Sequence, residues 1–312
     1  MARYFDPPEA YAPGLTFQLR KKLEGGELLT HVRQTPVPDL YARTETVVLI
    51  HGFNNHYGEA GTAYYSFRLR QYERANPQLV PPALEKILAD LFWPGDAAWG
   101  LFDLLDFLVY PTAVGTAKSA ARPLADHLRS MPNLRIVHFV AHSLGCRVAL
   151  ETIDNLRQEG GPTVGRVCLM AAAVPVFKVR SGGNLAQAME HAGAVRILYS
   201  SDDSVLRYAF PPGQTLAGSD EGVFPAALGL HRPPPGIAGR IDPVVVDRAG
   251  HSDYWGDSGR PPASLAADRV AEFFRFGSQE RTIAERTSGA APRTAGADAR
   301  EMGYARTFRS TP

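Results

Sequence analysis

Three residues of the types that carry out nucleophilic catalysis each stand shortly after a short apolar run: Ser143, Asp203 and His251. A serine hydroxyl becomes a strong nucleophile when a histidine takes its proton, and a carboxylate fixes the tautomer of that histidine and stabilises its charged form. Apolar runs of this kind predict buried strands, and reactive groups lie outside the carboxyl ends of the strands in an open parallel sheet. The pattern therefore predicts that the three side chains meet at one edge of a sheet.

The sequence around Ser143 has the pattern of a nucleophile elbow, a sharp turn between a strand and a helix. Residues 136–140 are apolar and rich in β-branched side chains, and apolar residues return at helical spacing from Val148 onward. The small residues Ala141 and Gly145 flank the serine, as required where a strand and a helix approach closely. The alternative is an ordinary serine at the N-terminus of a helix.

His251 is the expected general base because it follows the last predicted strand, in a loop preceded by a glycine. His138 and His142 fall inside the strand and the elbow, from which neither can swing over the serine. His51 precedes the loop expected to bind an oxyanion, and we expect it to brace that loop. The other histidines fall on predicted surface elements or at the start of a helix: His31, His56, His127, His191 and His231.

Two adjacent carboxylates, Asp202 and Asp203, leave the predicted strand 194–199 and compete for the role of the acid. Adjacent side chains point in different directions, so only one of them can meet His251, and the other is solvated or caps a helix. Asp253 is too close to His251 in the sequence to be the usual partner, and we expect it to cap the loop. The residues alone do not decide which of the two carboxylates, Asp202 or Asp203, is the acid.

The negative charge that develops on a carbonyl oxygen needs backbone amides to bind it. Leu144, directly after the serine, supplies one predicted donor, and Phe53, directly after His51 and Gly52, supplies the other. A glycine at position 52 lets the backbone turn there without a Cβ clash. The Asn54 side chain is a further candidate donor, and an ordinary turn is the equal alternative for this asparagine.

The elements that position these residues alternate between strands and helices, which predicts a mostly parallel sheet covered on both faces. Strands are expected at 15–19, 28–32, 46–50, 90–94, 136–140, 166–171, 194–199 and 243–247, and helices at 60–76, 112–131, 184–191 and 264–276.

The chain is expected to form one domain over residues 1–277, in which 15–34 is a hairpin. Residues 207–240 are rich in proline and glycine and are expected to form a long irregular loop. Residues 278–312 hold few large apolar side chains, so we expect a disordered tail.

Composition excludes several other classes of protein. The 33 basic and 32 acidic residues leave a net charge of +1, so no electrostatic case exists for nucleic acid or an anionic lipid surface. Cys146 and Cys168 lie in apolar segments and are expected to be core residues. No cluster has metal-ligand spacing and no phosphate-binding loop follows a strand, so no metal or cofactor is expected. No apolar stretch is long enough to span a membrane, and we expect a cytoplasmic protein.

Five segments of the sequence resemble the α/β-hydrolase superfamily, and more narrowly its poorly characterised bacterial branch of serine-hydrolase-like proteins. The resemblance covers about residues 40–276. The segments are 47–55, 92–95, 141–145, 199–203 and 250–255. Residues 201–206 are similar to the Ser-Xaa-Asp-Xaa-Xaa-Leu segment that carries the acid in that branch, and this match favours Asp203. Ala141 replaces the first glycine that is usual in the superfamily.

The resemblance implies an α/β-hydrolase fold and a serine hydrolase that cleaves a small carboxylic ester or thioester through a Ser-His-Asp triad and an acyl-enzyme. Two alternatives stay open: an acyltransferase with the same triad, and a catalytically silent protein of this fold that binds a ligand or partner. The apolar content of 99–108 and 207–240 suggests an apolar acyl or aromatic substrate, or equally side chains that pack against the core.

Overall fold

The computed structural model describes residues 14–22, 27–35, 42–53, 57–74, 84, 86–95, 106–256 and 259–275. Four predictions concern residues outside these ranges: the Asn54 side chain as an oxyanion donor, His56 at the start of a helix, most of the apolar segment 99–108, and the tail 278–312.

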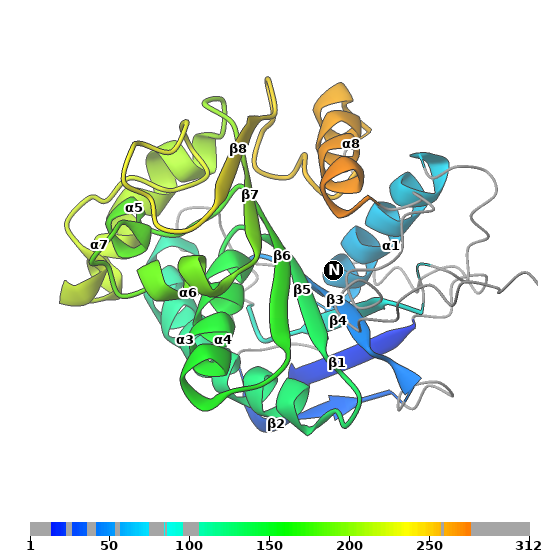
Figure 1. Ribbon diagram of the computed structural model, residues 1–312. Helices are drawn as coiled ribbons and strands as arrows, with labels where there is room; N and C mark the ends of the chain where they lie inside the picture. Colours follow the sequence, from blue (N-terminus) through cyan, green and yellow to red (C-terminus); the bar gives the residue numbers. More distant parts are fainter. Residues whose placement is uncertain are drawn as a thin grey trace, which may run out of the picture. The chain divides into compact units, whose positions relative to one another are not determined.

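Eight strands of the described residues form one sheet. In chain order they are β1 (Leu15–Arg20), β2 (Leu28–Gln34), β3 (Glu45–Ile50), β4 (Leu88–Phe92), β5 (Ile136–His142), β6 (Thr163–Met170), β7 (Ala194–Tyr199) and β8 (Ile241–Val245). The spatial order is β2-β1-β4-β3-β5-β6-β7-β8 (Figure 1). Only β1 and β2 pair antiparallel, and each other neighbouring pair is parallel. The predicted mostly parallel sheet is confirmed.

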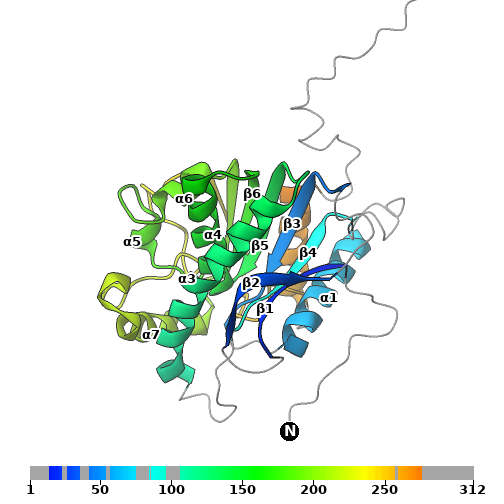
Figure 2. The same ribbon diagram turned by 90° about the horizontal axis from the view of Figure 1, so that it is seen from below.

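Helices cover both faces of this sheet, which explains why β5 is buried along its whole length. On one face lie α1 (Tyr57–Arg74) and α8 (Pro261–Phe274), which contact each other (Figure 1). On the other face lie α3 (Asp106–Ser130), α4 (Gly145–Glu159) and α6 (Ala186–His191), with α3 and α4 side by side (Figure 2). In the described part of the chain, no helix combines the length and the hydropathy needed to cross a bilayer.

Residues 207–240 contain more regular structure than the long irregular loop that the composition predicts. A π-helical turn over Val205–Ala209 leads into the helix α7 (Phe210–Ala217), which packs against α3. Pro211 and Pro212 stand in the first turn of α7, where the backbone N–H that proline lacks has no partner inside the helix, so prolines are compatible with a helix there. The rest of the segment consists mainly of turns, and antiparallel bridges join Ala227 to Pro175 and Ile237 to Arg180.

Candidate active site

Ser143 occupies the sharp turn between β5 and α4. Its φ angle is 54°, in the left-handed region that a residue with a side chain rarely adopts. The turn is held to β6 because the Ser143 N–H donates to the Met170 carbonyl, at 2.9 Å. A Cβ at Gly145 would lie only 2.3 Å from the His51 carbonyl oxygen, so only glycine fits there. The structure thus has the geometry of a nucleophile elbow.

The loop after β3 packs directly against the serine. A Cβ at Gly52 would lie 2.8 Å from the Ser143 Cβ, which brings the neighbouring Phe53 amide close to the serine. Within the described residues, neither the Phe53 N–H nor the Leu144 N–H donates to a backbone carbonyl. Among the described residues, no backbone carbonyl therefore occupies either of the two amides predicted to bind an oxyanion.

His51 braces this loop, as the sequence predicts. Its ring is stacked on Trp93 with centroids 5.6 Å apart, and the Trp93 indole N–H donates to the His51 carbonyl at 2.9 Å. The His51 Nδ1 lies 2.8 Å from the Gly52 carbonyl oxygen, so Nδ1 carries the proton. Burial, with a smaller effect from Arg20, lowers the pKa of His51 to about 3, and the ring is neutral.

His251 lies beside the serine, with its Nε2 2.8 Å from the Ser143 Oγ. It belongs to the loop after β8, and Asp253 organises this loop. The Asp253 Oδ2 accepts the Gly250 N–H at 2.8 Å and lies 2.6 Å from the Arg260 guanidinium. The expectation that Asp253 caps the loop agrees with these contacts.

The Asp203 carboxylate is fully buried and lies on the other side of the His251 ring. Its Oδ2 is 2.8 Å from the His251 Nδ1, and its Oδ1 accepts the Leu206 N–H at 2.9 Å. Because a carboxylate only accepts, the Nδ1 carries the proton and the Nε2 is free to accept the Ser143 O–H. Asp202, one residue earlier, is exposed. The structure therefore brings Asp203, and not Asp202, to His251.

Tyr110 of α3 is a residue of this region that sequence reasoning missed. Its ring packs edge-on against Phe53, with centroids 5.6 Å apart, and against Phe210 of α7, with centroids 6.4 Å apart. A Cβ at Gly213 would lie 2.8 Å from the Tyr110 ring, so glycine makes room for it. These three rings connect the loop after β3 with α7. The apolar sequence around Tyr110 gave a signal for burial but not for its partners.

A buried ion network holds residues 218–221 against α4. The Glu221 carboxylate is fully buried and lies 3.0 Å from the Arg147 guanidinium, four residues after the serine. Lys118 and Lys178 contribute ammonium groups 2.6 Å and 3.3 Å from the same carboxylate. Burial alone would raise the pKa of Glu221, but the Arg147 and lysine charges outweigh it, and the pKa is lowered. Sequence reasoning missed this network.

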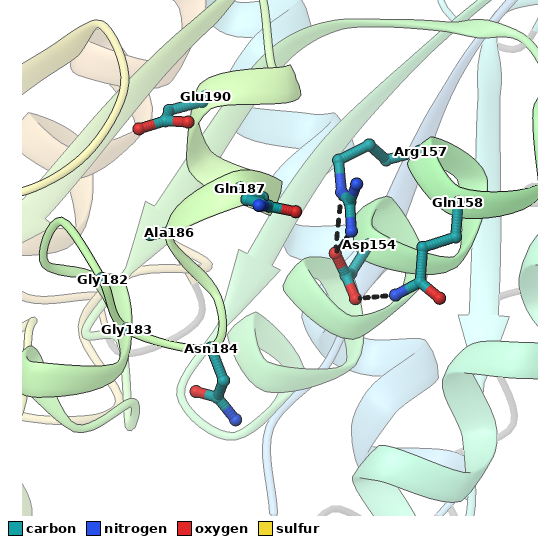
Figure 3. A pocket seen from close by; sticks show the side chains of 9 residues that line it. All are labelled: Asp154, Arg157, Gln158, Gly182, Gly183, Asn184, Ala186, Gln187 and Glu190. Atoms are coloured by element: carbon teal, nitrogen blue, oxygen red, sulfur yellow. Dashed lines mark hydrogen bonds and ion pairs between the residues drawn. The ribbon is translucent and has the colours of Figure 1, made fainter.

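A separate hollow of about 440 Å³ lies between α4 and α6 (Figure 3). Asp154 and Arg157 line it from α4 and form an ion pair at 3.0 Å, while Gln187 and Glu190 line it from α6. Asp154 is nine residues beyond the start of α4, about 14 Å along the helix. The hollow contains none of the three triad candidates.

The sheet topology, the covering helices and the elbow at the end of β5 define an α/β hydrolase. A family model supports this class directly: it is described as "Alpha/beta hydrolase of unknown function (DUF900)" and matches residues 37–210. The match spans more than half of the sequence, and the chain belongs to this family.

No curated protein matches the chain in sequence. Among solved structures, an esterase from Pyrobaculum calidifontis is similar with a TM-score of 0.42 and 14% identity, over 74% of this chain and 75% of that chain. Est1E from Butyrivibrio proteoclasticus, with bound ferulic acid, is similar with a TM-score of 0.39 and 10% identity, over 74% of this chain and 90% of that chain.

Proposed function

We propose that this protein is a serine hydrolase that cleaves a carboxylic ester or thioester. Ser143 is the nucleophile, His251 the general base and Asp203 the acid that orients it. The observation that carries the proposal is an unbroken hydrogen-bonded chain, with 2.8 Å from Ser143 Oγ to His251 Nε2 and 2.8 Å from His251 Nδ1 to Asp203 Oδ2. Membership of an α/β-hydrolase family supports the reaction class.

In the first half of the reaction, the Ser143 Oγ attacks the acyl carbon while its proton passes to the His251 Nε2. The carbonyl oxygen becomes negatively charged and accepts hydrogen bonds from the Leu144 and Phe53 amides. Asp203 stabilises the imidazolium and keeps its Nδ1 protonated. The tetrahedral intermediate then expels the alcohol or thiol, which takes the proton from His251, and an acyl-enzyme remains.

In the second half, water replaces the leaving group. His251 takes a proton from the water as it attacks the acyl carbon, and the same amides bind the second oxyanion. Collapse breaks the bond between the acyl carbon and the Ser143 Oγ, which recovers its proton from His251. The products are one carboxylic acid and one alcohol or thiol, and the enzyme is unchanged.

The substrate we propose is small and has an apolar acyl or aromatic part. Phe53 of the proposed oxyanion loop packs against Tyr110, and Tyr110 packs against Phe210, so aromatic rings extend from that loop to α7. Burial of apolar surface against such rings favours apolar ligands.

Labelling with a fluorophosphonate tests the assignment of the nucleophile. The Ser143 Oγ–P bond forms, the P–F bond breaks, fluoride leaves and His251 takes the serine proton, so the wild type should be labelled and Ser143→Ala should not. Equal labelling of both proteins would exclude Ser143. Hydrolysis of p-nitrophenyl esters of increasing chain length then measures acyl preference. Addition of an alcohol acceptor separates hydrolysis, which yields the acid, from acyl transfer, which yields a new ester.

A further inference from the structure

His142, the last residue of β5, stands next to the proposed nucleophile but takes no part in the proton transfers described above. Its Nε2 lies 2.8 Å from the backbone carbonyl oxygen of His251, a residue 109 positions further along the chain. A carbonyl oxygen only accepts, so the His142 Nε2 carries a proton and donates it to this bond. One side chain thus connects the elbow to the loop of the proposed base.

The surroundings of His142 fix the ring as well as its hydrogen bond. Its ring centroid lies 5.0 Å from that of His251, 5.8 Å from that of Tyr254 and 6.1 Å from that of Trp255. On its other side, a Cβ at Gly52 would lie 3.1 Å from the His142 Nδ1. The ring therefore fills the space between the loop of the proposed base and the proposed oxyanion loop.

The His142 ring is neutral and holds a single tautomer. Its Nδ1 is buried and has no hydrogen-bond partner within the described part of the chain, so no group there stabilises a second proton. Burial, and to a smaller extent the nearby His251, lower the pKa of His142 to about 3, against smaller opposing effects of the bond to the His251 carbonyl and of Asp203. The neutral ring therefore keeps its one proton on Nε2, where it donates to the His251 carbonyl.

We propose that His142 is a positioning residue that holds the His251 imidazole in line with Ser143 through the hydrogen bond from its Nε2–H to the His251 carbonyl. The role rests on the proposed function. Asp203 fixes the side chain of His251 and Asp253 fixes Gly250, the residue before it, while His142 fixes its carbonyl. Without this third bond, the loop is free to carry the Nε2 away from the Ser143 Oγ.

Two variants of similar polarity separate the donor position from the presence of a polar side chain. In His142→Gln the amide nitrogen can occupy the place of the Nε2 and donate to the His251 carbonyl. In His142→Asn the shorter side chain places its nitrogen near the position of the Nδ1, which cannot reach that oxygen. His138→Gln is the matched control, because His138 is buried on the same strand and contacts Glu45 and the Arg166 N–H instead.

The measurements are kcat and KM for a p-nitrophenyl ester and the rate of fluorophosphonate labelling. We expect kcat and the labelling rate to fall together in His142→Asn by about 10²-fold, the usual cost of a misplaced catalytic group, with KM near the wild-type value. His142→Gln should recover most of that loss. His138→Gln should keep the wild-type kcat even where it lowers the melting temperature. If His142 had only a structural role, His142→Asn would behave like this control and would not lower kcat selectively.

The outcomes distinguish the two proposals. If the wild type is labelled and His142→Asn reacts at the wild-type rate, or if His142→Gln is as slow as His142→Asn, the positioning role is overturned and the triad stands. If the wild type is not labelled, the proposed function fails and the role of His142 fails with it. Should His142→Asn not fold, the ¹⁵N spectrum of the wild-type imidazoles decides: a proton on the His142 Nδ1 would overturn the proposal.

Discussion

The Asp203 carboxylate lies 2.8 Å from the Nδ1 of His251, although the two residues are 48 positions apart in the chain. Asp203 is fully buried in the turn after β7, and its second oxygen accepts the Leu206 N–H. Both oxygens of the carboxylate are therefore occupied by donors, which fixes its orientation. Asp202, in the same turn, is exposed to solvent. Variants of the two neighbouring carboxylates therefore compare a residue that contacts His251 with one that does not.

We expect Asp203→Asn to lower kcat by roughly 10⁴-fold, the size of the corresponding effect in serine proteases, with KM little changed. The amide stabilises the wrong imidazole tautomer, so the Nε2 that faces Ser143 already carries a proton. Asp202→Asn should keep a near wild-type kcat, because its side chain does not contact His251. Steady-state kinetics of both variants on one p-nitrophenyl ester provide the measurement, and the reverse ranking would refute the assignment of Asp203.

The close approach of α4 to β3 predicts that Gly145 tolerates no side chain. A Cβ there would lie 2.3 Å from the His51 carbonyl oxygen and 2.8 Å from the Ile50 carbonyl oxygen. Both are backbone atoms, which cannot move away as easily as the end of a flexible side chain. Gly145→Ala should lower the free energy of unfolding by about 3 kcal/mol. Gly115→Ala is the control, because the site is open and helical, and it should be neutral or stabilising by up to about 1 kcal/mol. Urea unfolding of both variants tests this, and equal effects would contradict it.

The buried Glu221 carboxylate should contribute strongly to stability. Glu221→Gln leaves the Arg147 and Lys178 charges buried without their common partner, and we expect a loss of about 3 kcal/mol in the free energy of unfolding. Asp220 precedes it but is 62% exposed, so Asp220→Asn should cost less than about 1 kcal/mol. Thermal and urea unfolding would show the difference, and similar values for the two variants would argue against the network.

The same carboxylate predicts a pH dependence of stability. The pKa of Glu221 is lower in the folded protein than its ordinary value, because the surrounding cations outweigh the effect of burial. Its contribution is therefore complete above the unfolded-state pKa of about 4.3 and is lost as pH falls through the folded-state value. The stability difference between wild type and Glu221→Gln should be largest at neutral pH and shrink in acid. A difference that grows on acidification would contradict the lowered pKa.

Local sequence determined the fold class and the candidates for the site. Strands buried on both faces, such as β3 and β5, appear in the sequence as short, mostly apolar runs. The sharp turn at Ser143 requires small neighbouring residues, which also form a recognisable local pattern. The parallel order of the strands follows from their alternation with helices. Since parallel strands end at one edge, the polar residues after them were predictable as neighbours. The same patterns predicted one irregular loop over residues 207–240 and missed the helix α7 within it, because proline also starts helices.

Only the tertiary structure decided which polar side chains touch. Composition cannot distinguish exposed Asp202 from buried Asp203, and here the resemblance to a family, not the pattern, favoured the second. The bond from His142 to the His251 carbonyl joins residues 109 positions apart, and the pair of Arg147 with Glu221 joins residues 74 apart. Hydrogen bonds are directional and depend on tenths of an ångström, whereas the hydrophobic pattern of a sequence fixes only which face of an element is buried. Packing of distant segments sets those distances.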